Sequence, residues 1–231
     1  MTQLQGKVAV ITGASRGIGA AIARQLAAQG VSLGLASRRG DDLGIEGAVA
    51  APCDVRNRKD VEQFVQSTVD RFGGLDIVIA SAGLGAYMPF LDTPVEDIEE
   101  MVDTNVKGLM WTVRAALPHL LERGAGDIIT ISSESGRTGF AEETVYCAAK
   151  FAQVGFTRAL DAEVHGRNIR CANVCPGSVA TDFAMGRGRT PGMPELDEMM
   201  AAENVADVVS FVLMRPRNHR IVDTFFWPMN E

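Results

Sequence analysis

Short apolar runs alternate with longer segments of helical period along almost the whole chain. Such alternation is typical of repeated β-α-β units, in which each helix returns the chain so that the next strand lies parallel to the last. It predicts an α/β fold: a doubly wound sheet of about seven mainly parallel strands with helices on both faces. The expected strands are residues 7–12, 32–37, 48–52, 76–80, 127–131, 170–174 and 220–227, and the expected helices are residues 18–29, 58–72, 94–121, 145–165 and 202–214.

Short sequence motifs predict the local structure of three further segments. The run Thr93-Pro94-Val95-Glu96 predicts a helix start, with an N-cap hydroxyl, a proline at the first helical position and a capping-box acid. Residues 40–47 are too few and too rich in glycine for a full helix. Residues 184–194 hold three glycines and two prolines, which indicates a mobile loop.

Composition is that of an acidic globular protein. The chain has 231 residues, 46% of them hydrophobic, and 29 acidic against 22 basic residues give a net charge of −7. This length suffices for one large core, so we expect one domain over residues 1–231. The negative charge argues against a nucleic-acid surface. No apolar stretch reaches the ~20 residues of a membrane span and residues 1–7 lack the apolar run of a signal peptide, so we expect a cytoplasmic protein with no membrane partner.

The cysteines do not suggest a metal site. Cys53, Cys147, Cys171 and Cys175 are scattered, without a C-x-x-C pair, and the chain has three histidines. We therefore expect buried free thiols and no bound metal.

A glycine-rich turn follows the first expected strand and opens directly into a helix. It reads T-G-x-x-x-G-x-G over residues 12–19, which differs from the usual G-x-G-x-x-G dinucleotide fingerprint. Glycines let the backbone approach a pyrophosphate, and the helix terminus supplies positive potential. A merely tight connection is the alternative, but the position at the first β-α turn favours a nucleotide site in a Rossmann-type sheet. The expected cofactor contacts here are Gly13, Ser15, Arg16, Gly17, Ile18 and Gly19.

The end of the second strand discriminates between the two nicotinamide cofactors. An acid there would bind the adenosine ribose and repel a 2′-phosphate, but the chain reads Ser37-Arg38-Arg39. Guanidinium groups suit bidentate phosphate contact, so NADP(H) is favoured, with Arg16 as a second charge. NAD(H) stays possible if Arg38 and Arg39 are ordinary exposed charges.

A tyrosine and a lysine supply the candidate proton-transfer groups. Tyr146 and Lys150 lie four residues apart in an expected helix, and therefore on one face. A neighbouring ammonium lowers the pKa of a phenol, so the pair can exchange a proton with an alcohol or carbonyl. Ser133 follows the fifth strand and can hydrogen-bond the substrate oxygen. A Tyr-x-x-x-Lys face alone is commonplace, but a doubly wound sheet would bring it together with the glycine-rich turn, Ser133 and Asn105.

Together these motifs resemble those of the short-chain dehydrogenase/reductase family, over residues 7–216. The resemblance implies that Tyr146 is the general acid/base and that Ser133 positions the substrate carbonyl. It implies that Lys150 holds the nicotinamide ribose and lowers the pKa of Tyr146, while Asn105 supports a water-mediated proton relay. Further implied cofactor contacts are Asp54, Val55, Ala82, Gly83, Pro176, Gly177, Val179 and Thr181.

The functional hypothesis is an NADP-dependent oxidoreductase that interconverts a carbonyl and a secondary alcohol, on a ketone, an aldehyde or a 3-oxoacyl compound. Two alternatives stay open: an NAD-dependent dehydrogenase of a polyol or hydroxy compound, and a catalytically idle nucleotide-binding regulatory protein. The family resemblance also implies a homodimer or homotetramer.

Substrate contacts are expected within residues 83–87, 133–140 and a loop over 183–200. Phe140 and Phe183 suggest an apolar wall. Glu134 either binds a substrate hydroxyl or amine, or points outward to solvent. The aromatic residues 225–227 are interpreted as core or subunit-interface packing, with a neighbour's substrate pocket as the alternative.

Overall fold

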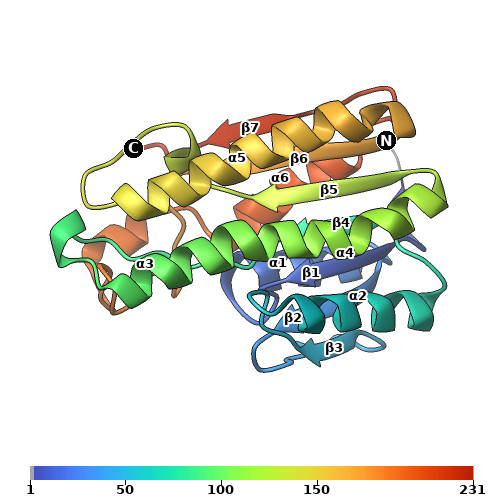
Figure 1. The fold of residues 1–231 in the computed structure, drawn as a ribbon, viewed down its shortest axis with the longest axis horizontal. Coiled ribbons are helices and arrows are strands. Elements are labelled where there is room, and N and C mark those ends of the chain that lie inside the picture. The colour runs from blue at the N-terminus through green and yellow to red at the C-terminus, as the bar shows by residue number, and fades with distance from the viewer. Residues whose placement is uncertain (1–2, 231) are drawn as a thin grey trace.

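The seven strands form one parallel sheet. The computed structural model describes residues 3–230, and its strands pair in the order β3-β2-β1-β4-β5-β6-β7 (Figure 1). Each of these pairings is parallel, which confirms the expected doubly wound α/β fold. The strands are β1 (Val8–Thr12), β2 (Ser32–Ser37), β3 (Val49–Pro52), β4 (Ile77–Ala80), β5 (Gly126–Ile131), β6 (Ile169–Pro176) and β7 (Asp223–Phe226).

Helices cover both faces of this sheet. α1 and α6 pack on one face, and α2, α4 and α5 pack on the other, toward the viewer of Figure 1. Along β1, Ala9 and Ile11 pack in the core beneath α1 and α6, whereas Val8 and Val10 pack in the core beneath α2, α4 and α5. Burial on both faces explains why the strands read as continuous apolar runs. The helices are α1 (Gly17–Ala28), α2 (Arg58–Phe72), α3 (Val95–Val102), α4 (Gly108–Arg123), α5 (Thr144–Val164) and α6 (Ala202–Leu213).

The strand order reverses at β1. The chain proceeds from β1 to β2 and β3 on one side, and β4 to β7 lie on the other. In sheets of this type a crevice opens at the carboxyl ends of the strands where the order reverses. Thr12 pairs with Ala36 on one side and with Ala80 on the other, so these three strand ends are level. The segments that follow them are placed to build a site.

The helix expected over residues 94–121 is interrupted. A π-helical turn, Asp103–Lys107, separates α3 from α4 and contains the fully buried Asn105. Single π-helical turns within α-helices are frequent at functional sites.

The expected N-cap of this helix is also wrong. The Thr93 hydroxyl donates to the Pro89 carbonyl (3.2 Å) and so closes the preceding 3-10 turn. α3 begins after Pro94 instead, whose carbonyl accepts the N–H groups of Asp97 and Ile98.

The other connections contain no long helix. Residues 40–47 form turns, as predicted, and Leu43 and Ile45 pack against the core beside α1. Residues 183–200 contain one short 3-10 helix, Pro194–Glu198. Between residues 3 and 230, no helix is long and apolar enough to cross a membrane.

Candidate active site

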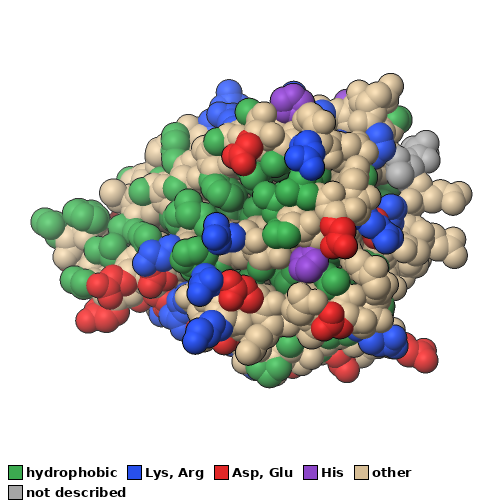
Figure 2. Space-filling model, turned by 45° about the vertical axis from the view of Figure 1, so that its right-hand side comes forward, with side chains coloured by type: hydrophobic (Ala, Val, Ile, Leu, Met, Phe, Trp, Pro, Cys, Tyr) green, Lys and Arg blue, Asp and Glu red, His purple; other side chains and the backbone are tan. Residues whose placement is uncertain are grey.

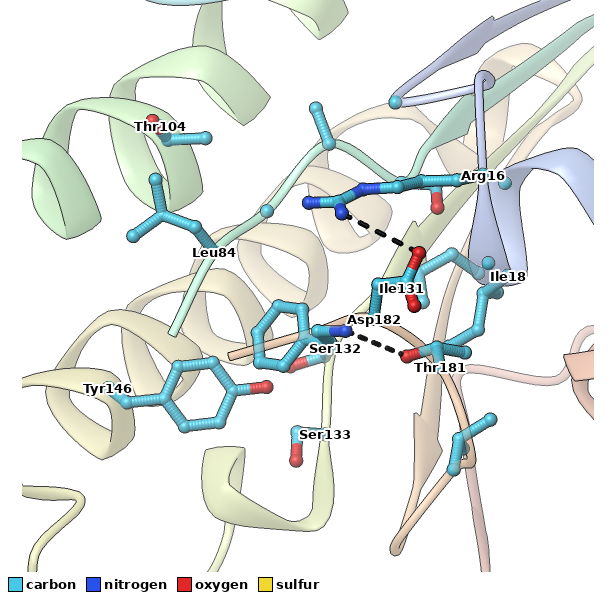
Figure 3. A pocket seen from close by; sticks show the side chains of 18 of the residues that line it. Arg16, Ile18, Leu84, Thr104, Ile131, Ser132, Ser133, Tyr146, Thr181 and Asp182 are labelled. Atoms are coloured by element: carbon cyan, nitrogen blue, oxygen red, sulfur yellow. Dashed lines mark hydrogen bonds and ion pairs between the residues drawn. The ribbon is translucent and has the colours of Figure 1, made fainter. Parts of the chain in front are cut away.

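A cleft runs along the carboxyl ends of the strands. Figure 3 shows side chains from distant segments around one space, among them Arg16 beside α1, Tyr146 of α5 and Thr181 after β6. The predicted residues that line it are Gly13, Ser15, Arg16, Gly17, Ile18, Gly19, Ser37, Arg38, Asp54, Val55, Ala82, Gly83, Ser133, Glu134, Tyr146, Lys150, Pro176, Gly177, Val179, Thr181 and Phe183. Three predicted residues lie outside this lining: Arg39, Asn105 and Phe140.

The β1-α1 turn approaches the end of β4 very closely. Gly13 has φ +69°, and a Cβ there would lie 2.7 Å from the Ala82 Cα. A Cβ on Gly19 would lie 2.3 Å from the Gly13 carbonyl oxygen. The N-cap residue, Arg16, makes no side-chain hydrogen bond to the first turn of α1. This helix end therefore offers backbone N–H groups and positive potential to an anion.

Two arginines face the cleft beyond β2 and β3. The Arg38 side chain is 69% exposed, and its Nη1 lies 3.9 Å from Glu100 Oε1. Arg56, which the sequence analysis missed, contacts the carboxylates of Asp54 (2.6 Å) and Glu100 (3.2 Å). The hydrogen bond from Arg56 lowers the pKa of Asp54. The position of Arg56 directly after the expected cofactor contacts Asp54 and Val55 could have identified it from the sequence.

The structure does not bring Arg39 to these arginines. The Arg39 Nε donates to Asp41 Oδ2 (3.0 Å), two residues away, and the side chain borders a separate hollow beside residues 40–43. Arg16 does line the cleft, where its Nη1 lies 3.8 Å from Asp182 Oδ2.

Ser133 and Tyr146 meet at the inner end of the cleft. In Figure 3 the Tyr146 hydroxyl is directed toward Ser132 and Ser133. Ser133 follows β5, and its Oγ accepts a hydrogen bond from the Ser135 N–H (3.2 Å), which fixes this turn. Tyr146 lies in the first turn of α5 and is 6% exposed.

Burial dominates the pKa of Tyr146, and the lowering expected from Lys150 stays a prediction. Burial raises the pKa of Tyr146 well above its usual value, and a hydrogen bond with Ser133 opposes the shift without cancelling it. The Lys150 Nζ lies 5.5 Å from the centre of the Tyr146 ring, a distance at which an ammonium favours a phenolate. Because burial dominates the pKa, the phenol is protonated at neutral pH.

Lys150 is buried one turn further along α5. Its Nζ donates to the Ile131 carbonyl (3.1 Å) and to Gln153 Oε1 (3.0 Å). Burial lowers the pKa of Lys150 to about 8. An ammonium carries three donors, so one N–H remains for a ligand in the cleft.

Asn105 supports the cleft from behind. Its Nδ2 donates to the Leu84 carbonyl (2.8 Å), and its Oδ1 accepts from the Leu84 N–H (2.9 Å). A Cβ on Gly83 would lie 3.0 Å from the same Oδ1. The Asn105 side chain thus holds the backbone that follows β4, which explains why it does not line the cleft.

Aromatic rings surround Tyr146. The ring centres of Tyr87 and Phe183 each lie 5.6 Å from that of Tyr146. Phe183 comes from the loop after β6, and a Cβ on Gly85 would lie 2.7 Å from its ring. Arg189 of the same loop lies over the Tyr87 ring (5.8 Å). These contacts place two of the predicted substrate-facing segments against each other.

Glu134 connects the cleft to the C-terminal strand. It lines the cleft, is half-buried, and accepts a hydrogen bond from Trp227 Nε1 at the surface. Trp227 in turn stacks on Phe225, with ring centres 6.4 Å apart. Phe140 is 38% exposed and lies outside the cleft lining.

The cysteines are buried free thiols, as predicted. Burial raises the pKa of Cys53, Cys171 and Cys175 to about 12, so these thiols stay protonated and unreactive. Among residues 3–230, no cluster of three or more histidine, cysteine or acidic side chains is placed to hold a metal ion.

Comparisons with known proteins agree with this geometry. The family model for short chain dehydrogenases matches residues 7–191. An oxidoreductase of Staphylococcus haemolyticus is 34% identical, over 99% of this chain and 100% of its own. Glycine betaine reductase of Emericella nidulans is also 34% identical over 99% of this chain, which spans 19% of that longer protein.

Among solved structures, the closed form of a serine dehydrogenase complexed with NADP+ superposes with a TM-score of 0.90 and 32% identity, over 97% of this chain and 96% of that one. The family model, the full-length relative and the similar solved structure agree with one another. The chain therefore belongs to the short-chain dehydrogenase family and is an oxidoreductase that acts on CH–OH groups with a nicotinamide cofactor.

Proposed function

We propose that the protein uses NADPH to reduce a carbonyl group to an alcohol, which is a secondary alcohol where the carbonyl is a ketone. The observation that carries this proposal is that an anion-binding helix terminus, cleft arginines, Ser133, Tyr146 and Lys150 all line one cleft. In this proposal residues 1–231 form one domain, and the loop over 183–200 covers the substrate. The rings of Tyr87 and Phe183 supply an apolar wall suited to ketones, aldehydes or 3-oxoacyl compounds.

The outer half of the cleft fits a nicotinamide dinucleotide. Gly13 and Gly19 cannot carry a Cβ without meeting neighbouring backbone, which keeps this turn tight, and the first turn of α1 is suited to bind the pyrophosphate. The free N–H of Lys150 holds the nicotinamide ribose, and residues 176–181 contact the carboxamide. When bound, the nicotinamide supplies the hydride.

Tyr146 is the general acid in the proposed direction. Its raised pKa keeps the phenol protonated, so it can donate a proton to the substrate oxygen as the carbonyl carbon receives the hydride. The Ser133 hydroxyl hydrogen-bonds the same oxygen and orients the carbonyl. The Lys150 ammonium stabilises the phenolate that is left.

Arg38 and Arg56 support a preference for NADP(H) over NAD(H). Arg38 is largely exposed, and its 3.9 Å contact with Glu100 is long, so the guanidinium can turn to a 2′-phosphate at little cost. Arg56 contacts the same Glu100 oxygen (3.2 Å) and adds positive charge. The serine dehydrogenase with the similar fold is complexed with NADP+.

The substitution Tyr146→Phe tests the proposal. It keeps the ring packing and removes the proton, so kcat should fall about 1,000-fold, while NADPH still binds with unchanged fluorescence quenching. Activity is measured by nicotinamide absorbance on a panel of ketones, aldehydes and 3-oxoacyl compounds. Equal turnover by the variant and the unmodified protein would contradict the proposal. Tyr87→Phe, which removes the neighbouring phenol, is the matched control and should cost far less.

We also propose a homodimer or homotetramer built through α4 and α5. Met110 of α4 and Phe151 of α5 are 37% and 47% exposed. Figure 2 shows hydrophobic side chains gathered between charged ones on one face of the molecule. A second copy would cover them through a symmetric interface. Sedimentation velocity at assay concentration is the test, and a monomer would contradict it.

A further inference from the structure

Gln153 joins two parts of the site that come from different elements. It lies on α5, three residues after Lys150, and is 2% exposed. Its Oε1 accepts a hydrogen bond from Lys150 Nζ (3.0 Å), and its Nε2 donates to the Asn105 carbonyl (2.8 Å). The carboxamide therefore connects the buried ammonium to the π-helical turn between α3 and α4.

Asn105, to which Gln153 donates, is itself held in place by hydrogen bonds. The Asn105 side chain makes two hydrogen bonds with the backbone of Leu84, which directly follows the cleft residue Gly83. A π-helical turn departs from the regular i→i+4 ladder, so its carbonyl groups are open to side-chain donors. Gln153 thus ties Lys150 to the same turn that supports the backbone after β4.

The carboxamide affects Lys150 in two ways. Together with the Ile131 carbonyl it occupies two of the three ammonium donors, and the third is left for the cleft, where a Cβ on Gly83 would lie 3.9 Å from Nζ. The carbonyl dipole also favours the charged form of Lys150, which burial disfavours.

The charge state of Lys150 depends on few other groups. Tyr146 of α5 faces it at 5.5 Å from the ring centre, and Cys175 of β6 is the group whose negative form would favour the ammonium. On β5, the Ile131 carbonyl accepts a hydrogen bond from Lys150. The π-helical turn contributes only through Gln153, which binds the Asn105 carbonyl.

We propose that Gln153 is a positioning residue that anchors the Lys150 ammonium and keeps it charged for the reaction. The inference rests on the role proposed above for Lys150. A carboxamide N–H does not release its proton at neutral pH, so the link fixes Lys150 and does not pass a proton to Asn105. In this protein the Gln153 side chain links Lys150 directly to the Asn105 carbonyl.

Two substitutions separate the contacts. Gln153→Leu removes both hydrogen bonds at similar volume, whereas Gln153→Glu keeps an acceptor for Lys150 and loses the donor to Asn105. We expect the leucine variant to lower kcat about 10- to 100-fold, because a displaced ammonium misaligns the site. Activity of the leucine variant should fall at a lower pH than in the unmodified protein, because the Lys150 ammonium loses an acceptor and its pKa drops. Activity of the glutamate variant should fall at a higher pH, because a carboxylate favours the ammonium and raises that pKa.

Lys150 can also be titrated directly, without turnover. The chain has four lysines, so the carbon-13 resonances of labelled lysine side chains can be followed individually against pH. The control is Thr157→Val, which removes the buried hydroxyl contact with Thr130 (2.8 Å) about two turns beyond Lys150 along α5. It should lower thermal stability and leave the Lys150 titration unchanged.

Opposite shifts of the Lys150 titration in the leucine and glutamate variants support the proposal. Shifts in the same direction, or none, overturn it, as does a loss of activity no larger than that of Thr157→Val. If the unmodified protein reduces no carbonyl at all, the proposed function fails, and the lysine titration still decides whether Gln153 sets the charge of Lys150.

Discussion

The outer and inner halves of the cleft are built differently. The outer half, around the β1-α1 turn, is formed by backbone in close contact: a Cβ at Gly13 or Gly19 would overlap neighbouring main-chain atoms. The inner half is formed by side chains from distant segments, such as Tyr87, Tyr146 and Phe183. Backbone atoms cannot move aside for an added methyl group, whereas rings can. The outer half should therefore tolerate far less change than the inner half.

Gly19→Ala tests the rigid outer half and should have the largest effect. The new Cβ would lie 2.3 Å from the Gly13 carbonyl oxygen, so the turn must open. We expect a loss of about 1–3 kcal/mol in unfolding free energy and a fall in NADPH affinity of about 100-fold, which corresponds to about 2.8 kcal/mol. Fluorescence titration and thermal melting measure the two effects.

The matched control for this substitution is Gly166→Ala. Gly166 follows α5, and a Cβ there meets nothing within 4 Å. NADPH affinity should be unchanged in the control. An unchanged affinity in Gly19→Ala as well would show that this turn does not bind the cofactor.

Arg38→Asp tests the one part of the outer half that depends on a side chain. Replacing the guanidinium with a carboxylate removes a charge-assisted contact worth about 1.5–3 kcal/mol, so KM for NADPH should rise about 10- to 100-fold. KM for NADH should change little, because NADH lacks the 2′-phosphate. Steady-state kinetics with both cofactors check this, and equal changes would remove Arg38 from the 2′-phosphate site. Arg39→Asp is the control, since Arg39 pairs with Asp41 outside the cleft.

The same difference explains what could be predicted from the sequence. The sheet, its flanking helices and the β1-α1 turn follow from apolar periodicity and glycine spacing, which act over a few residues. Tyr146 and Lys150 share a face because they are four apart in α5. These features are local, and the structure agrees with them closely.

Features that depend on packing between segments were not predictable in this way. The π-helical turn at Asn105 is held by contacts with Leu84 and Gln153, which are far from it in the sequence. The pKa of Tyr146 rises because Phe183 and other distant residues bury it, although the adjacent lysine predicts the opposite. The link from Gln153 to Asn105 gives no signal in the sequence, because the two residues are 48 apart.

Gly85→Ala tests the adaptable inner half. The new Cβ would lie 2.7 Å from the Phe183 ring, which can rotate or shift with its loop. We expect KM for the carbonyl substrate to rise about fivefold and the NADPH dissociation constant to stay unchanged. Gly139→Ala, where a Cβ meets nothing within 4 Å, should change neither constant. A loss of NADPH affinity as large as that of Gly19→Ala would erase the distinction between the two halves.

Trp227→Phe should have the smallest effect. It removes the indole N–H that Glu134 accepts and keeps an aromatic ring beside Phe225. Because the Trp227 side chain lies at the surface, 42% exposed, water can replace the lost donor, and KM for the substrate should change about threefold or less. Trp111→Phe, which alters the other tryptophan, on α4 away from the cleft, is the control. A change in substrate KM confined to Trp227→Phe would mean that the C-terminal strand shapes the inner half of the cleft, while identical kinetics in both variants would make the strand a purely structural edge of the sheet.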